Sequence, residues 1–164
     1  MNDAQKKAST ECLRIEEDAE QSAKRHFNAA TRWSHYNYWT GIPSVMVAAA
    51  GSAVSFASWP VVGGILAAIT GALTAMLTFL KPSERATAHT TTGNQYLRLR
   101  NETRVFREID LPQLTGEDLA EKFKPFTQRR DDLNDSSPMT EDGDYQKANQ
   151  GILDGQTEYK ADKK

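Results

Sequence analysis

Apolar and charged positions are segregated along the chain. No Asp, Glu, Lys or Arg occurs between Trp33 and Leu80, so all 20 Lys and Arg and all 22 Asp and Glu lie outside that segment. Two apolar stretches inside it, at about 40–57 and 61–80, are each close to the length at which a helix spans about 30 Å of hydrocarbon. The pattern predicts two membrane-spanning helices.

The tripeptide Ser58-Trp59-Pro60 links the two stretches and is too short to hold a domain. The two spans are therefore expected to form a helical hairpin, in which Pro60 suits the first position of the second helix and Lys81-Pro82 ends it. Aromatic residues gather at the ends of the spans, where amphipathic rings meet lipid headgroups. The candidate interface anchors are Trp33, Trp39 and Trp59.

Basic residues give the hairpin an expected orientation. Lys24, Arg25 and Arg32 precede it and Lys81 and Arg85 follow it, whereas the connecting tripeptide has no Lys or Arg. The positive-inside rule therefore places both termini in the cytoplasm, and the first span acts as its own insertion signal because no cleavable signal precedes it. A buried hairpin in a soluble protein is the alternative, but the remaining residues are too polar to cover that much apolar surface.

The segments on either side of the hairpin are helical by pattern. Residues 3–38 lack Pro and Gly, and their apolar positions recur at helical spacing, which predicts an amphipathic helix that continues into the first span. These positions are Ala8, Cys12, Ile15, Ala19, Ala23, Phe27 and Ala30. Three further helices are expected at about 83–108, 115–134 and 140–153, with Ser83 and Thr115 as caps, a disturbance at Pro125 and a frayed end at 161–164.

The fold class that follows is an all-α membrane protein with three segments. Residues 1–38 form an N-terminal cytoplasmic amphipathic helix, 39–81 the transmembrane hairpin and 82–164 a C-terminal cytoplasmic helical region. No segment has the period-two alternation typical of a strand.

Small residues recur every four positions in the second span. Such rows let helices approach closely in lipid, where packing and interhelical hydrogen bonds drive association. Because a hairpin offers each helix one intramolecular partner, rows on adjacent faces favour contacts between several copies, and hence a homo-oligomer. The alternative is that they only pack the hairpin. The candidate positions are Gly64, Ala68 and Ala72 in one row and Ala67, Gly71 and Ala75 in the next.

A row of hydroxyls also follows the second span, at Thr70, Thr74 and Thr78. In an oligomer, such a row can line a water-filled pore, and the absence of charged residues from the spans predicts weak discrimination by charge. The alternative is that these threonines hydrogen-bond to carbonyls of their own helix or to a neighbouring helix.

A basic stretch follows the hairpin beside Tyr96. Arginine binds phosphate in bidentate geometry and stacks on bases, so this stretch is a candidate contact for an anionic ligand such as a nucleotide, or for anionic lipid. The alternative is a solvated face paired with Glu102 and Glu108. The residues are Arg98, Arg100, Arg104 and Arg107.

Other chemistry is poorly represented. The net charge of −2 argues against a dedicated nucleic-acid-binding protein, and a lone cysteine excludes an internal disulfide. Cys12 lies among acids that raise its pKa, and His26, His35 and His89 are not at metal-ligand spacing. We therefore expect no enzyme, no metal and no resident cofactor.

The order of elements resembles the SLATT family of two-span membrane effectors. The likeness covers roughly residues 10–160 and consists of an aromatic-ending helix from Phe27 to Trp39, the hairpin with almost no loop, and two later helices. Their matching residues are His89, Tyr96, Leu97 and Leu99, then Tyr145, Ala148, Gly155, Glu158 and Tyr159.

The resemblance implies a function in bacterial anti-phage defence. Members are found beside synthases of nucleotide second messengers, which implies a multi-pass protein of the inner membrane that self-associates, breaches the membrane and causes cell death or growth arrest. It also implies control by a cyclic oligonucleotide or by a component of the nucleotidyltransferase system. The alternatives are a non-enzymatic anchor that scaffolds a soluble partner, and a phage-type lysis protein.

Overall fold

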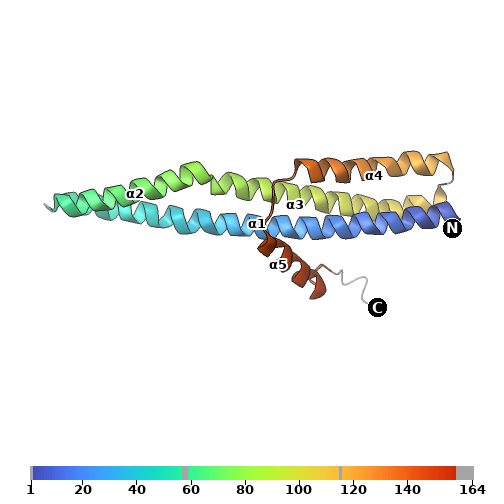
Figure 1. The fold of residues 1–164 in the computed structure, drawn as a ribbon, viewed down its shortest axis with the longest axis horizontal. Helices are drawn as coiled ribbons and strands as arrows, with labels where there is room; N and C mark the ends of the chain where they lie inside the picture. The colour runs from blue at the N-terminus through green and yellow to red at the C-terminus, as the bar shows by residue number, and fades with distance from the viewer. Residues whose placement is uncertain (1, 57–58, 115, 158–164) are drawn as a thin grey trace. The chain divides into compact units, whose positions relative to one another are not determined.

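The computed structural model describes residues 2–56, 59–114 and 116–157, and this part of the chain is helical with no strand. The elements are α1 (Asp3–Phe56), α2 (Pro60–Leu80), α3 (Pro82–Val105), a π-helical turn η1 (Phe106–Asp110), a 3-10 turn η2 (Leu111–Gln113), α4 (Glu117–Ser136) and α5 (Asp142–Leu153) (Figure 1). The expected all-α class is confirmed for these residues.

The helices belong to two compact units. Residues Ala30–Thr87 form one, which we call the hairpin unit, and Met1–Ala29 with Ala88–Lys164 form the other, which we call the polar unit. The division falls inside the expected segment 1–38, because α1 is long enough to contribute to both units.

The hairpin unit is built from the second half of α1 and from α2. Helix α1 continues past Pro43, and Pro60 occupies the first turn of α2, as the sequence predicts. Lys81 adopts a left-handed conformation (φ 46°) and donates its N–H to the carbonyl of Leu77, after which α3 begins at Pro82. The expected end of the second helix of the hairpin at Lys81-Pro82 is therefore confirmed. Ser58, part of the expected link, lies outside the described residues.

Glycines let the two hairpin helices approach closely. A Cβ on Gly51 would lie 3.1 Å from the Cβ of Leu66, and one on Gly63 would lie 3.2 Å from the Cβ of Ser55. Both glycines are buried, as is Ser44, whose Oγ lies 3.4 Å from Oγ1 of Thr74. These contacts form the seam of the hairpin.

The polar unit has a core along the expected stripe of α1. Ile15, Ala19 and Ala23 pack with Leu99 of α3 and Leu133 of α4, which lies alongside α3 in Figure 1. In a second cluster, Cys12 of α1 packs with Phe106 of η1, Leu111 of η2 and Leu119 of α4. Burial of these small and medium side chains is the main source of stability in a helical unit of this kind.

Helix boundaries differ from expectation in several places. Helix α3 begins at Pro82 rather than after a Ser83 cap, and it ends at Val105 by widening into η1, three residues before the expected end near Glu108. Pro125 lies inside α4 without ending it. Helix α5 begins with a capping box between Glu141 and Asp144 that the sequence analysis did not identify. The expected cap Thr115 and the expected frayed end at 161–164 lie outside the described residues.

Candidate functional site

The apolar stretches of the hairpin are exposed. Both helices are long and apolar enough to cross a membrane. The chain itself buries only 11% of the most apolar window of α1 and only 6% of the corresponding window in the helix that begins at Pro60. A core helix of a soluble protein of this size would be mostly buried. Ile42, Val45, Met46, Ile65 and Phe79 are among the large exposed side chains. Within the described chain, nothing covers this surface.

The candidate small-residue rows of α2 lie mostly outside the seam; only Ala67 borders it among the described residues, with its backbone N 3.9 Å from the position of a Cβ on Gly51. Gly64 and Gly71 have no neighbouring atom within 4 Å of the position of a Cβ. The alanines of the same rows are also exposed: Ala67, Ala68, Ala72 and Ala75. The close approach within the hairpin instead uses Gly51 and Gly63, which the sequence analysis did not single out. The candidate rows are thus left available to a neighbour outside the chain.

A groove of about 580 Å³ runs along one side of the hairpin. Its polar side chains donate hydrogen bonds to carbonyls of their own helices: Ser52 to Ala48 at 3.0 Å, Ser55 to Gly51 at 2.8 Å and Thr70 to Leu66 at 3.0 Å. Because these donors are satisfied, the groove is suited to an apolar occupant. Its lining is Ala48, Gly51, Ser52, Ser55, Phe56, Gly63, Ala67, Thr70 and Gly71.

In the single chain, the threonine hydroxyls make the contacts expected of the alternative to a pore, which are hydrogen bonds to carbonyls of their own helix or contacts with the neighbouring helix. The hydroxyls of Thr70 and Thr78 donate to carbonyls one turn earlier, and Thr74 contacts Ser44 across the seam. Such hydrogen bonds leave the hydroxyl oxygens able to accept from water. A pore-lining role in an oligomer stays a prediction.

The three tryptophans lie near the ends of the apolar helices. Trp39 and Trp59 are 79% and 66% exposed, as interface anchors require. Trp33 is half-buried, and its ring is approached by two guanidiniums, those of Arg32 and Arg85. Their function as membrane anchors stays a prediction.

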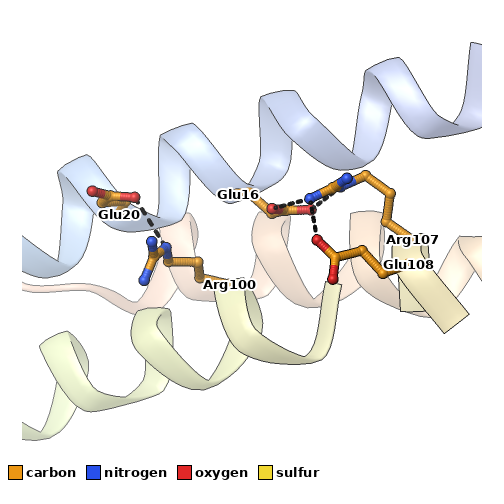
Figure 2. A network of polar contacts seen from close by, with 5 residues as sticks. All are labelled: Glu16, Glu20, Arg100, Arg107 and Glu108. Atoms are coloured by element: carbon orange, nitrogen blue, oxygen red, sulfur yellow. Dashed lines mark hydrogen bonds and ion pairs between the residues drawn. The ribbon is translucent and has the colours of Figure 1, made fainter. Parts of the chain in front are cut away.

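Two of the four candidate ligand-binding arginines bind acids of α1 (Figure 2). Nε of Arg107 donates to Oε1 of Glu16 at 2.7 Å and Nη2 to Oε2 at 3.2 Å. Nε of Arg100 lies 3.0 Å from Oε2 of Glu20. The hydrogen bonds that Arg107 donates to Glu16 raise the pKa of its guanidinium above the usual value.

These pairings differ from those that the sequence suggested. Arg107 also contacts Glu108, as the sequence alternative had it, but its principal partner is Glu16. Glu102 instead binds Arg129 of α4 at 2.5 Å. Arg98 is exposed on α3 and remains the candidate best placed to meet an external anion. Glu16 and Glu20 lie one turn apart on the same face of α1, and this spacing is the feature of the sequence that could have indicated them as partners of the arginines.

A buried histidine pair is the most distinctive polar feature that the sequence analysis missed. Nδ1 of His26 lies 2.9 Å from Nδ1 of His89, the two residues are 2% and 3% exposed, and the ring of Tyr96 stacks on His26. Burial lowers the pKa of His26 to about 4, with further lowering by His89 and Arg25 and an opposing effect of Asp144. His26 is therefore neutral near pH 7, where it contacts His89 of α3.

The thiol of Cys12 has the raised pKa that the sequence predicts. Burial, and then the charge of Glu16, raise the pKa of its thiol to about 11. Among the described residues, no group of three or more His, Cys, Asp or Glu is arranged to hold a metal ion. The expectations of no enzyme and no resident cofactor stay predictions.

Comparison of the chain with protein-family models, with curated proteins and with solved structures gives no match.

Proposed function

We propose that this protein is a membrane effector that self-associates through its hairpin and permeabilises the bacterial inner membrane, with both termini in the cytoplasm. The observation that carries the proposal is the exposure of the two apolar windows, of which only 11% and 6% are buried. So much apolar surface is stable in lipid, and helices satisfy their backbone hydrogen bonds there.

Self-association is supported by the division of small residues between two sets. Gly51 and Gly63 pack within the seam, whereas Gly64 and Gly71 face open space. Close approach of small residues is a main source of attraction between helices in lipid. The exposed set and the adjoining groove therefore form the surface that a second copy of the hairpin occupies.

The biological setting of the proposal comes from the resemblance to SLATT effectors. In that setting the protein acts in anti-phage defence and causes cell death or growth arrest when a nucleotide second messenger or a partner acts on the polar unit. Such control requires the ligand to bind the permeabilising state more tightly than the resting state. The alternative is an anchor that scaffolds a soluble partner, for which the helical polar unit supplies the binding surface.

The test replaces the two open glycines, in Gly64→Leu and Gly71→Leu, and measures dye uptake and membrane depolarisation on expression. Each added side chain separates the copies, and we expect association to weaken about tenfold per substitution, equivalent to about 1.4 kcal/mol. Permeabilisation should fall accordingly, while insertion into the membrane persists.

Ala50→Leu is the matched control, because Ala50 is exposed on α1 and belongs to neither candidate row nor to the groove lining. It should permeabilise like the original chain. If the glycine variants also do so, the small-residue surface is not the contact. If the unaltered chain inserts but causes no dye uptake at any expression level, the anchor function is the correct one.

A further inference from the structure

A pocket of about 300 Å³ lies beside the turn that joins α2 to α3. Asn37 lines it from α1, Leu77 from α2, and Lys81, Ser83 and Glu84 from the turn and the start of α3. All of these residues belong to the hairpin unit. The volume is at the lower end of the range for small-molecule sites, about 300 to 1,000 Å³, so the pocket suits one small polar group.

A cation and an anion line this pocket side by side. Nζ of Lys81 lies 3.1 Å from Oε2 of Glu84, and the two side chains are 59% and 70% exposed. An ammonium has three N–H donors and a carboxylate has about four acceptor positions, so this one contact leaves both groups able to bind a further partner. An exposed pair of this kind is also held together only weakly.

Two further observations indicate that the pocket has a use for its polar side chains. The amide of Asn37 is half-buried and has no hydrogen-bond partner among the described residues. Lys81 is the one non-glycine residue of the described chain with a positive φ, 46°. Glycine adopts that conformation without strain and is the usual residue after a helix, so a lysine there favours a function for its side chain.

The pocket lies at the end of the apolar helices. Asn37 is near the start of the uncharged segment of α1, and Lys81 directly follows the last residue of α2. Polar and charged residues just beyond an apolar span lie at the depth of the lipid headgroups. A headgroup is therefore the small polar group that this pocket meets in a membrane.

We propose that the pocket binds the phosphoethanolamine headgroup of a zwitterionic phospholipid. This inference rests on the proposed membrane location. The phosphate accepts hydrogen bonds from Nζ of Lys81 and from the amide of Asn37, and the primary ammonium donates to the carboxylate of Glu84. A bound headgroup thereby joins α1 to the turn between α2 and α3.

The paired charges select among headgroups that share a phosphate. A trimethylammonium has no N–H to donate to Glu84, so phosphatidylcholine loses that hydrogen bond. Phosphatidylglycerol has no ammonium, and its net negative charge meets the negative charge of Glu84. Because phosphatidylethanolamine and phosphatidylcholine carry the same net charge, a diffuse electrostatic attraction does not distinguish them, whereas this pocket does.

The test extracts the full chain from vesicles with equal parts of phosphatidylethanolamine, phosphatidylcholine and phosphatidylglycerol, and counts each lipid retained per chain by mass spectrometry. We expect retention to favour phosphatidylethanolamine. Glu84→Gln should lower its preference over phosphatidylcholine about fivefold, the upper end of the effect of one exposed charge pair. Lys81→Gly keeps the turn, because glycine tolerates its φ, and should lower retention of phosphatidylethanolamine by a similar factor. Asn37→Leu should lower it severalfold.

Glu11→Gln is the matched control, because Glu11 forms an ion pair of the same spacing with Arg14 in the polar unit, outside the pocket. It should keep the preference. Equal loss in Glu11→Gln, an unchanged preference in Glu84→Gln, or equal retention of the three lipids by the unaltered chain overturns the site. Displacement of the lipid by an equal concentration of soluble glycerophosphoethanolamine shows a site for a soluble ligand and also overturns it.

The headgroup site and the proposed function fail in different ways. If alkaline carbonate strips the chain from the vesicles, the membrane location is wrong and both proposals fall. If the chain stays in the membrane and retains the three lipids equally, only the headgroup site is wrong.

Discussion

Replacing Arg107 with alanine is expected to lower the free energy of opening of the polar unit by about 3 kcal/mol, because the change leaves the carboxylate of Glu16 without its partner. The two side chains are 21% and 12% exposed, and Arg107 donates to both oxygens of Glu16 (Figure 2). Leaving a shielded carboxylate unpaired is costly, whereas an exposed ion pair contributes less than about 1 kcal/mol.

Two further variants separate the ion pair from a general effect of losing an arginine. Arg98→Ala removes an exposed arginine of the preceding helix α3 and should change the free energy by less than about 0.5 kcal/mol. The double variant Glu16→Gln with Arg107→Gln removes both charges and keeps similar shapes, so it should recover more than half of the loss. Together with the unaltered chain and the single variants Glu16→Gln and Arg107→Gln, the double variant forms a double-mutant cycle that measures the coupling between the pair.

Cys12 reports on this opening because it is the sole cysteine and is 0% exposed. The measurement is the labelling rate of its thiol in the full chain, relative to the rate in the denatured chain. A loss of about 3 kcal/mol corresponds to labelling that is faster by about two orders of magnitude in Arg107→Ala. Equal rates in Arg107→Ala and Arg98→Ala would show that the pair contributes no stability.

Acidification from about pH 7 to about pH 5 is expected to weaken the polar unit by about 2 kcal/mol through His26. The pKa of His26 is about 4 in the folded chain, against an ordinary value of 6.5, because its neutral ring is buried beside His89 and Arg25, with Asp144 opposing. Two imidazolium rings cannot both be accommodated at an Nδ1–Nδ1 distance of 2.9 Å.

The sign follows from proton binding. Between pH 4 and pH 6.5 the unfolded state binds more protons at His26 than the folded state does, so stability rises with pH across that window. The contribution of His26 is complete above pH 6.5 and is lost as the pH falls toward 4, where the loss reaches about 3 kcal/mol.

Hydrogen exchange of the amides of α1 and α3, measured in the full chain and corrected for the intrinsic rate at each pH, checks this expectation. His26→Gln should remove most of the difference in protection between the two pH values. His35→Gln is the matched control, because His35 is exposed and belongs to the hairpin unit. A flat profile in the unaltered chain, or the same change in both variants, contradicts the assignment.

Much of the fold could be predicted because the deciding signals are local. The absence of charge from Trp33 to Leu80 predicts the apolar hairpin, and Pro60 predicts where its second helix begins. The stripe that contains Cys12, Ile15 and Ala19 predicts the buried face of α1. Each of these depends on spacing within one helix, which a sequence displays directly.

Contacts between helices were less predictable, because they depend on how each helix is rotated and on which turn meets which. Four of the five glycines of the hairpin unit look equivalent by composition, yet Gly51 and Gly63 are buried in the seam and Gly64 and Gly71 face open space. A glycine is chemically the same on every face of a helix, so only the packed hairpin shows which of these glycines are buried and which are exposed.

The sequence by itself determined the helical class, the uncharged hairpin and the apolar face of α1, because periodicity and charge are properties of each segment alone. Only the tertiary structure decided that Arg107 binds Glu16, that His26 meets His89, and that Arg85 returns to Trp33 of α1. The physical reason is that such partners lie far apart in the chain and are selected by the register of packed helices.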